Sequence, residues 1–287
     1  MSFFTPFAFV KTTAAAPAPP SFDYFLDSYP SASTAFSIRK LRSTYSGDCL
    51  VVKRSNDNAT QSIGFVDNMI DTGSILSFVG SNNGYVTKWF DQSGNNRTLE
   101  TNNISGNETW IVNSGSIITE GGLPSISNPN QNSFSLKSGS TFITIDYQTA
   151  YVVGINKGLA PTTVVAYPIG SNSSTGFGWN IQAGLGVTTN SFFGFDGGTV
   201  LDFNYVGQNI FTVASLYQTG STGYGWVENV QKVTGTLGLL QFSAAFARGG
   251  DGSFWHSGSI SEIITYDDNK INDASGSYSN IMTYYGL

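Results

Sequence analysis

The chain has 287 residues, only 11% of which are charged, and its formal net charge is −6. Binding to nucleic acid would require clustered lysine and arginine, so this composition argues against that class of partner. No run approaches the roughly eighteen apolar residues of a membrane helix, and we expect no membrane partner. Polarity comes instead from Ser, Thr, Asn and 33 Gly, while aromatic residues reach 14%. This composition is typical of an antiparallel β protein with many turns.

Residues 1–20 are expected to form a flexible arm ahead of one domain, residues 21–287. The segment 11–20 (Lys-Thr-Thr-Ala-Ala-Ala-Pro-Ala-Pro-Pro) cannot build a core and favours polyproline II. Two interpretations stay open for the tip that precedes it: a disordered terminus, or an anchoring peptide that docks on a neighbouring subunit. The anchoring residues would be Phe3, Phe4, Phe7 and Phe9.

The first part of the domain mixes helix and strand signals. Apolar residues at helical spacing predict a helix between Ser31 and Gly47. A second helical segment is predicted with Asp71 or Thr72 as its N-cap and Gly80 at its end. Strands are predicted at 49–54, 61–66 and 85–90. The few clustered basic residues are expected on a solvated face, not in a binding patch: Arg39, Lys40, Arg42, Lys53 and Arg54.

The heptad 89–95 (Trp-Phe-Asp-Gln-Ser-Gly-Asn) follows the third of these strands. Asp91 can accept backbone N–H bonds from residues ahead of it, Gly94 can take a positive φ, and Asn95 tolerates the same region. These properties predict a structural turn, with Trp89 or Phe90 held in the core beneath it. The alternative is a sugar or cation site, with Asp91 and Asn95 as oxygen ligands and Trp89 as a stacking platform.

Beyond Gly121, apolar segments alternate with Gly, Asn and Ser clusters at the spacing of a β-sandwich. Residues 257–266 alternate as a strand, and 269–285 are expected to form a closing helix. No repeat of 20–50 residues is present, which argues against a solenoid or propeller. The remaining strands are predicted at 142–147, 150–156, 162–168, 176–182, 191–195, 209–217, 223–227 and 239–247.

A second candidate site is the segment 248–256 (Arg-Gly-Gly-Asp-Gly-Ser-Phe-Trp-His). A carboxylate beside aromatic rings, here Asp251 beside Phe254 and Trp255, suits carbohydrate recognition or general acid catalysis. The same residues equally fit a hairpin, because Asp-Gly is a strong turn signal. His256 is the only histidine and no nucleophile motif accompanies it, so we expect no metal site and no cofactor.

Two parts of the chain resemble known families. The stretch 258–267 (Gly-Ser-Ile-Ser-Glu-Ile-Ile-Thr-Tyr-Asp), followed by an ending Tyr-Tyr-Gly-Leu, resembles the end of concanavalin A-like, laminin G-type jelly-roll domains. The series 41–47, 51–57 and 89–95 resembles the catalytic domain of fungal α-L-arabinofuranosidase B, and still more closely bacteriophage structural proteins built on that domain. The resemblance implies an all-β, concanavalin A-like jelly-roll β-sandwich with a few short peripheral helices.

The resemblance also bears on catalysis. In the arabinofuranosidases a Gly-Gly-Asp carries the general acid/base, which corresponds here to Asp251 in residues 249–251. Their nucleophile is a Glu in a Met-Glu-Asn context, whereas residues 193–198 offer only Asp196, and their adjacent cysteines are not matched by the single Cys49. With one of two carboxylates matched, we expect no catalytic residue and no enzyme. The possible glycan-binding residues are Asp251, Trp255, Phe254 and Asp196.

The function implied by the resemblance is that of a structural protein of a tailed-phage virion, displayed on the head or tail surface as a decoration protein or tail fibre. Residues 1–20 would bind other virion subunits, and host surface glycans would be a further partner of a homo-oligomer. The alternatives are a glycoside hydrolase of arabinofuranosidase type and a free, lectin-like carbohydrate-binding module.

Overall fold

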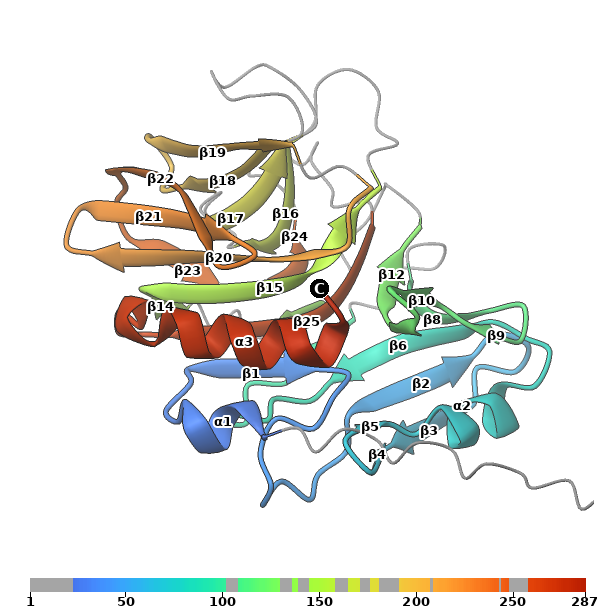
Figure 1. The fold of residues 1–287 in the computed structure, drawn as a ribbon. Coiled ribbons are helices and arrows are strands. Elements are labelled where there is room, and N and C mark those ends of the chain that lie inside the picture. Colours follow the sequence, from blue (N-terminus) through green and yellow to red (C-terminus); the bar gives the residue numbers. More distant parts are fainter. Residues whose placement is uncertain are drawn as a thin grey trace, which may run out of the picture.

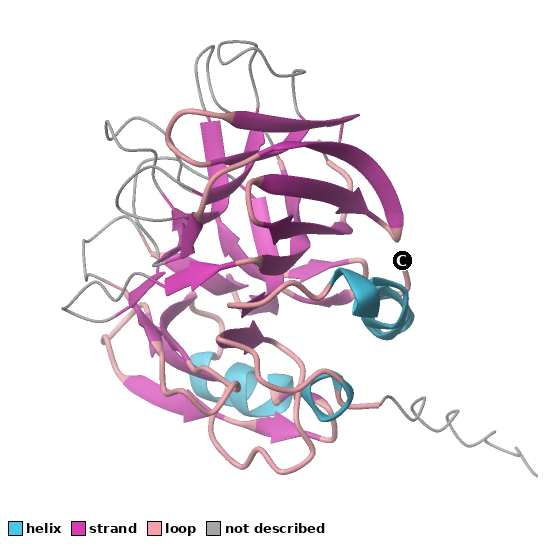
Figure 2. Ribbon diagram, turned by 90° about the vertical axis from the view of Figure 1, so that its left-hand side faces the viewer, coloured by secondary structure: helices cyan, strands magenta, loops and turns pink. Residues whose placement is uncertain are grey.

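A computed structural model of the chain describes residues 23–101, 108–129, 136–138, 145–157, 165–170, 176–180, 191–206, 209–242, 244–247 and 258–287. The expected arm, residues 1–20 with its four phenylalanines, lies outside this part of the chain. The described residues form layers of antiparallel strands with short helices at the periphery (Figures 1 and 2). The predicted β-sandwich is therefore confirmed.

The first layer is an antiparallel sheet built around a long strand near the C-terminus, β25. On one side β25 pairs with β1 and β12, and on the other with β15, after which β20, β21 and β22 follow in order. Every residue of β25 is buried, because helix α3 covers one face and the second layer covers the other. The strands are β1 Thr34–Ser37, β12 Ile126–Asn128, β15 Thr149–Asn156, β20 Thr212–Thr219, β21 Thr222–Val227, β22 Val230–Thr236 and β25 Gly258–Tyr266.

The second layer runs β19, β18, β17, β16, β24 and continues through β13 and β7 into the N-terminal strands. Those strands are β6, β2 and β3, with β8 and β9 along the other side of β6. The strands of this layer are β2 Leu50–Arg54, β3 Thr60–Ile63, β6 Gly84–Trp89, β7 Leu99–Glu100, β8 Thr109–Asn113, β9 Ser116–Ile117, β13 Leu136–Ser138, β16 Val165–Gly170, β17 Gly176–Asn180, β18 Ser191–Phe195, β19 Val200–Val206 and β24 Ala244–Ala247.

Three two-stranded pairs complete the sheets. Two of them are tight hairpins of neighbouring strands, and the third joins distant parts of the chain. They are β4 Phe65–Val66 with β5 Met69–Ile70, β10 Thr119–Glu120 with β11 Leu123–Pro124, and β14 Ile145–Tyr147 with β23 Leu240–Phe242.

The helices are α1 (Phe25–Ser28), α2 (Thr72–Val79), the 3-10 turn η1 (Ile271–Asp273) and α3 (Ala274–Tyr285). The predicted caps of α2 are confirmed, since the Asp71 side chain accepts the Ser74 N–H at 2.9 Å and Gly80 closes the helix at φ +60°. The closing helix is confirmed as α3 with the preceding turn. No helix within the described ranges is long and apolar enough to cross a membrane.

The helix predicted between Ser31 and Gly47 is wrong. Residues 34–37 form strand β1, which lies opposite residues 262–265 of β25 and is fully buried. Ser, Thr and β-branched residues have only weak helix propensity, so a sheet partner far along the chain decides the local conformation. Because every residue of β1 is buried, apolar residues need not alternate along it, and their spacing resembles that of a helix.

The expectation that Arg39 lies on a solvated face is also wrong. Its side chain is 2% exposed, and its Nε and Nη2 atoms donate to the fully buried carboxylate of Glu262 at 2.7 and 2.9 Å. Burial by itself would lower the pKa of Arg39, but the charge and hydrogen bonds of Glu262 have the larger effect. The pKa of Arg39 is therefore raised above its usual value. The Tyr284 ring of α3 covers the guanidinium at 4.8 Å. This pair joins the segment after β1 to β25 and to α3.

Candidate functional site

The heptad 89–95 forms a turn that holds the segment leading into β1. Trp89 is fully buried, and the two oxygens of Asp91 accept four hydrogen bonds, from the backbone N–H groups of residues 35, 93 and 97 and from one hydroxyl. Gly94 has φ +96°, and the Asn95 amide donates to two backbone carbonyls ahead of β1 at 3.1 Å each. The oxygens that a sugar or cation would need at Asp91 are thus already engaged within the fold.

The segment 248–257 connects, along the chain, a strand of the second layer with a strand of the first. The ends of these two strands define one end of each layer. In the second layer Ala247, the last residue of β24, lies opposite Tyr167 near the start of β16. In the first layer Gly258, which begins β25, lies opposite Asn156 and Asn128 at the ends of β15 and β12. We call this side of the sandwich, at the top of Figure 1, the loop end. Substrate-binding groups commonly sit on loops positioned by such a rigid scaffold.

Of the four residues predicted to bind glycan, three lie outside the described residues: Asp251, Phe254 and Trp255. The fourth, Asp196, follows β18 at the end opposite to the loop end, because Phe195 lies opposite Gly176 and Val200. The structure therefore places Asp196 apart from Ala247 and Gly258, between which Asp251 is located in the chain.

The Asp196 carboxylate accepts backbone N–H bonds from Gly198, Thr199 and Gly238 at 2.9, 2.6 and 2.5 Å. Partial burial would raise the pKa of Asp196, but these bonds outweigh it and hold the pKa below its usual value. Its carboxylate is ionised at neutral pH and joins two turns. Such a group is unsuited to act as a general acid.

Two carboxylates that the sequence reasoning missed lie at the loop end. Glu120 of β10 is 8% exposed, and its Oε1 atom accepts the Ser259 hydroxyl at 2.8 Å and contacts Lys157 Nζ at 2.5 Å. Glu228, in the turn between β21 and β22, accepts the Thr212 hydroxyl at 2.7 Å. Ser259 is two residues past the segment 248–257, so Glu120 contacts the described residues that directly follow that segment in the chain.

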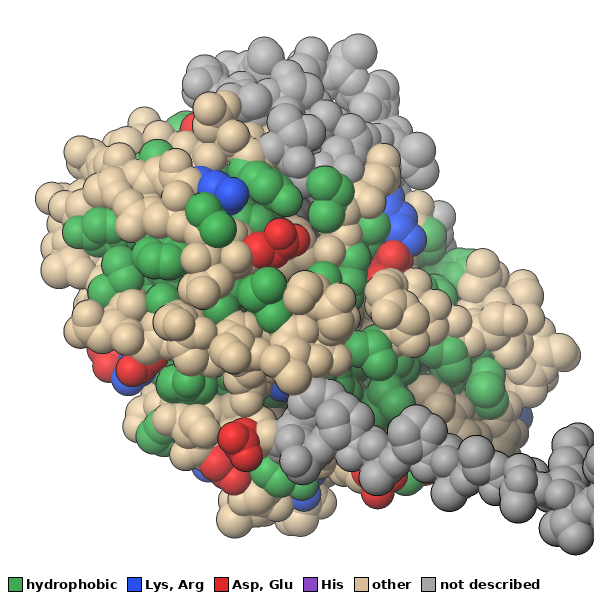
Figure 3. Space-filling view, in the orientation of Figure 1, with side chains coloured by type: hydrophobic (Ala, Val, Ile, Leu, Met, Phe, Trp, Pro, Cys, Tyr) green, Lys and Arg blue, Asp and Glu red, His purple; other side chains and the backbone are tan. Residues whose placement is uncertain are grey.

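Nothing in the local sequence marks Glu120 as a site residue, because Ser259 is 139 positions away along the chain. The contact exists only because β10 is brought next to the start of β25. On the face seen in Figure 3, Lys and Arg side chains are few and scattered. Among the described residues, no three His, Cys, Asp or Glu side chains are grouped so that they could hold a metal ion.

Comparison of the sequence with protein-family models and with curated proteins gives no significant match. Solved structures do match. A GH54 α-L-arabinofuranosidase soaked with a cyclic sulfate inhibitor aligns over 87% of this chain with a TM-score of 0.63 and 14% identity. An arabinofuranosidase in complex with arabinofuranosyl-α-1,2-xylobiose aligns with a TM-score of 0.63 and 15% identity, again over 87% of this chain. This chain covers 62% of each of those two proteins.

A third match is a glutamate-to-glutamine variant of a GH54 enzyme soaked with 4-nitrophenyl α-L-arabinofuranoside, with a TM-score of 0.60 and 14% identity. At these identities the comparison shows a shared fold. The relation to the arabinofuranosidase fold that the sequence motifs implied is thereby supported.

The prediction of a phage structural protein that is not an enzyme is overturned by the same matches. The solved structures that share this fold are arabinofuranosidases, soaked with an inhibitor or an aryl arabinofuranoside or in complex with an arabinofuranosyl xylobiose, and they give a virion role no support. The resemblance to the arabinofuranosidase fold is supported, whereas the choice of a virion protein over a glycoside hydrolase was wrong.

Proposed function

We propose that this chain is the hydrolytic domain of a glycoside hydrolase that removes α-L-arabinofuranosyl groups. The observation that carries the proposal is the alignment of 87% of the chain with arabinofuranosidases, one of them in complex with arabinofuranosyl-α-1,2-xylobiose. Fold alone does not dictate activity. The sequence adds a candidate acid, the Gly-Gly-Asp of residues 249–251, which lies in the chain between strands β24 and β25.

Hydrolysis of a glycoside requires two carboxyl groups, about 5–5.5 Å apart in retaining enzymes and about 6.5–9.5 Å apart in inverting ones. In our proposal Asp251 is the general acid/base. Glu120 is the second carboxyl, since it is the described carboxylate next to the strand that follows the segment of Asp251. Lys157 and Ser259 fix its Oε1 atom, which holds the group in one orientation. Asp196 has no part in the proposed chemistry because its oxygens are occupied by backbone N–H groups.

The test is turnover of 4-nitrophenyl α-L-arabinofuranoside by the full chain and by carboxylate-to-amide variants. Asp251→Asn and Glu120→Gln are each expected to lower kcat by about a hundredfold or more, the usual contribution of a positioned acid or base. The matched control is Asp146→Asn, an exchange of the same kind at an exposed position, and it should leave turnover unchanged. Circular dichroism and unfolding midpoints verify that each variant is folded.

The outcomes are distinct. Wild-type turnover that both site variants abolish supports the proposal in full. Activity lost in Asp251→Asn but retained in folded Glu120→Gln keeps the hydrolase and removes Glu120 from the chemistry. Absence of wild-type turnover on the arabinofuranoside, with hydrolysis of another aryl glycoside, overturns the sugar class. Absence of turnover on any aryl glycoside overturns the hydrolase proposal itself.

A further inference from the structure

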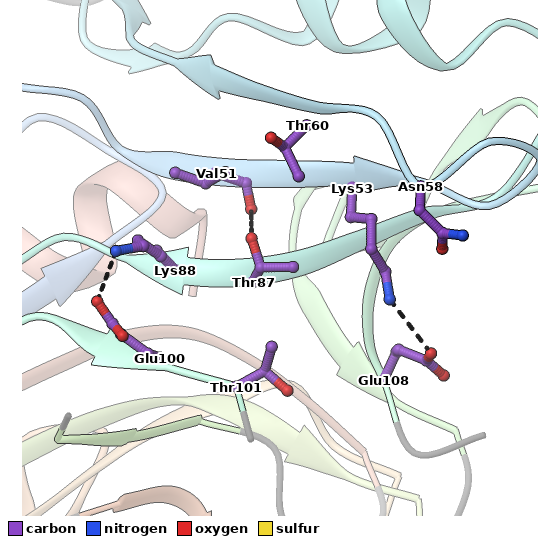
Figure 4. A pocket seen from close by; sticks show the side chains of 9 residues that line it. All are labelled: Val51, Lys53, Asn58, Thr60, Thr87, Lys88, Glu100, Thr101 and Glu108. Carbon is purple, nitrogen blue, oxygen red and sulfur yellow. Dashed lines mark hydrogen bonds and ion pairs between the residues drawn. The ribbon is translucent and has the colours of Figure 1, made fainter. Parts of the chain in front are cut away.

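A groove of about 710 Å³ lies on the N-terminal part of the second layer (Figure 4). It follows from the alternation of strand β2, where Leu50 and Val52 point into the core while Val51 and Lys53 face outward. Polar residues of β3, β6 and β7, and of the segments that adjoin β3, β7 and β8, complete the lining. None of these residues is one of the two carboxylates proposed for hydrolysis, and the groove reaches the start of β8, which pairs with β12 of the loop end.

Two ion pairs flank the groove. Lys88 Nζ lies 2.7 Å from Glu100 Oε1, and Lys53 Nζ lies 3.5 Å from Glu108 Oε1. Figure 4 shows each lysine directed at its glutamate, with Thr87 between the two pairs. The four charges sum to zero, so the groove has no net preference for an anion or a cation.

The remaining lining offers hydrogen-bond donors and acceptors. Thr60 and Thr101 contribute hydroxyls and Asn58 an amide, and the Thr87 hydroxyl, which donates to the Val51 carbonyl, can still accept. Val51 is the one apolar residue of this lining. Each ammonium has three N–H donors and each carboxylate has about four acceptor positions, so the ion pairs leave capacity on both partners. Pockets for apolar small molecules are lined mainly by hydrophobic and aromatic side chains, which does not describe this groove.

We propose that this groove binds a neutral pentose polysaccharide chain, which it holds while the loop end acts on a side group. A neutral sugar presents hydroxyls that both donate and accept, and this matches a surface without net charge that carries both donors and acceptors. The Tyr85 ring is covered by Lys53 Nζ at 5.4 Å, so binding uses hydrogen bonds and not stacking on that ring. A weak site of this kind gains from avidity because it is tethered to the site that acts on the same polymer. The choice of a pentose polymer rests on the proposed function.

The experiment is affinity gel electrophoresis of the full chain in gels that contain soluble arabinoxylan, with polygalacturonate gels for comparison. Two groove variants remove both charges of one pair: Lys88→Met/Glu100→Gln and Lys53→Met/Glu108→Gln. The matched control is Lys270→Met/Asp268→Asn, which removes a surface pair of similar geometry, 2.8 Å, outside the groove. Exposed pairs contribute little to stability, so the Lys88/Glu100 variant in particular should fold.

Each groove variant is expected to weaken retention by arabinoxylan by about tenfold or more, as loss of at least one hydrogen bond to a charged group implies. The control should keep wild-type retention, and all three should keep wild-type turnover of 4-nitrophenyl α-L-arabinofuranoside, which is too small to need the groove. Wild-type retention in both groove variants overturns the proposal, as does absence of retention of the wild type. Retention by polygalacturonate in place of arabinoxylan overturns the neutral ligand.

This result is separable from the proposed hydrolysis. Groove-dependent retention without turnover refutes the hydrolase and leaves the binding site standing. Turnover without groove-dependent retention refutes the groove as a polysaccharide-binding site and leaves the hydrolase proposal standing.

Discussion

The ion pair between Arg39 and Glu262 makes a quantitative prediction about stability. The Glu262 carboxylate accepts two N–H groups of Arg39 and the hydroxyls of Ser37 and Tyr285, and it is fully buried. Glu262→Gln leaves the Arg39 guanidinium without its negative counter-charge. Arg39→Met leaves the Glu262 carboxylate without its positive counter-charge. Removal of one partner of a buried pair costs about 3–5 kcal/mol, a large share of the roughly 5–15 kcal/mol by which a domain is stable.

The double variant Arg39→Met/Glu262→Gln discriminates between a pair that acts as a unit and two independent side chains. If the costs were additive, the double variant would lose about 6–10 kcal/mol and would not fold. We expect it instead to lose no more than either single variant, because neither buried charge is left alone. Urea unfolding monitored by tryptophan fluorescence gives all four free energies at a common slope. Single variants that each lose less than about 1 kcal/mol, the range of exposed pairs, would refute the reasoning.

Three further predictions concern other parts of the fold. Asp91→Ala should destabilise the protein by about 2–4 kcal/mol in urea unfolding, because buried backbone N–H groups lose their charged acceptor, and a loss under about 1 kcal/mol would contradict its structural role. Gly225→Ala should cost about 1–3 kcal/mol because the added carbon would overlap the Phe203 ring, whereas Gly64→Ala, with no atom within 4 Å, should be nearly neutral. Burial raises the pKa of Tyr151 to about 12, so its contribution to stability is fully present below about pH 10 and is lost as the pH rises toward 12. The last part of the phenolate absorbance should therefore appear together with loss of the fold, and titration of all tyrosines in a folded protein would contradict this.

The sequence by itself determined the fold class and many local elements. Composition and turn spacing predicted a β-sandwich, strand 191–195 has the predicted bounds, and Asp71 and Gly80 cap α2 as expected. These features depend on interactions within a few residues: side-chain caps, positive φ at glycine, and the period of two in a strand. The motifs at 39–97 also indicated the arabinofuranosidase fold, although they did not separate a hydrolase from a virion protein.

Tertiary structure decided what depends on distant pairing. Residues 34–37 are a strand because β25 lies beside them, and Arg39 is buried because Glu262, 223 residues away, neutralises it there. The positions of two carboxylates depend on distant contacts in the same way. Asp196 joins two turns through Gly238, while Glu120 lies at the loop end because β10 is packed next to Ser259. Local propensity amounts to less than about 1 kcal/mol per residue, whereas burial of a charge or of a strand involves several, so long-range contacts determine these positions.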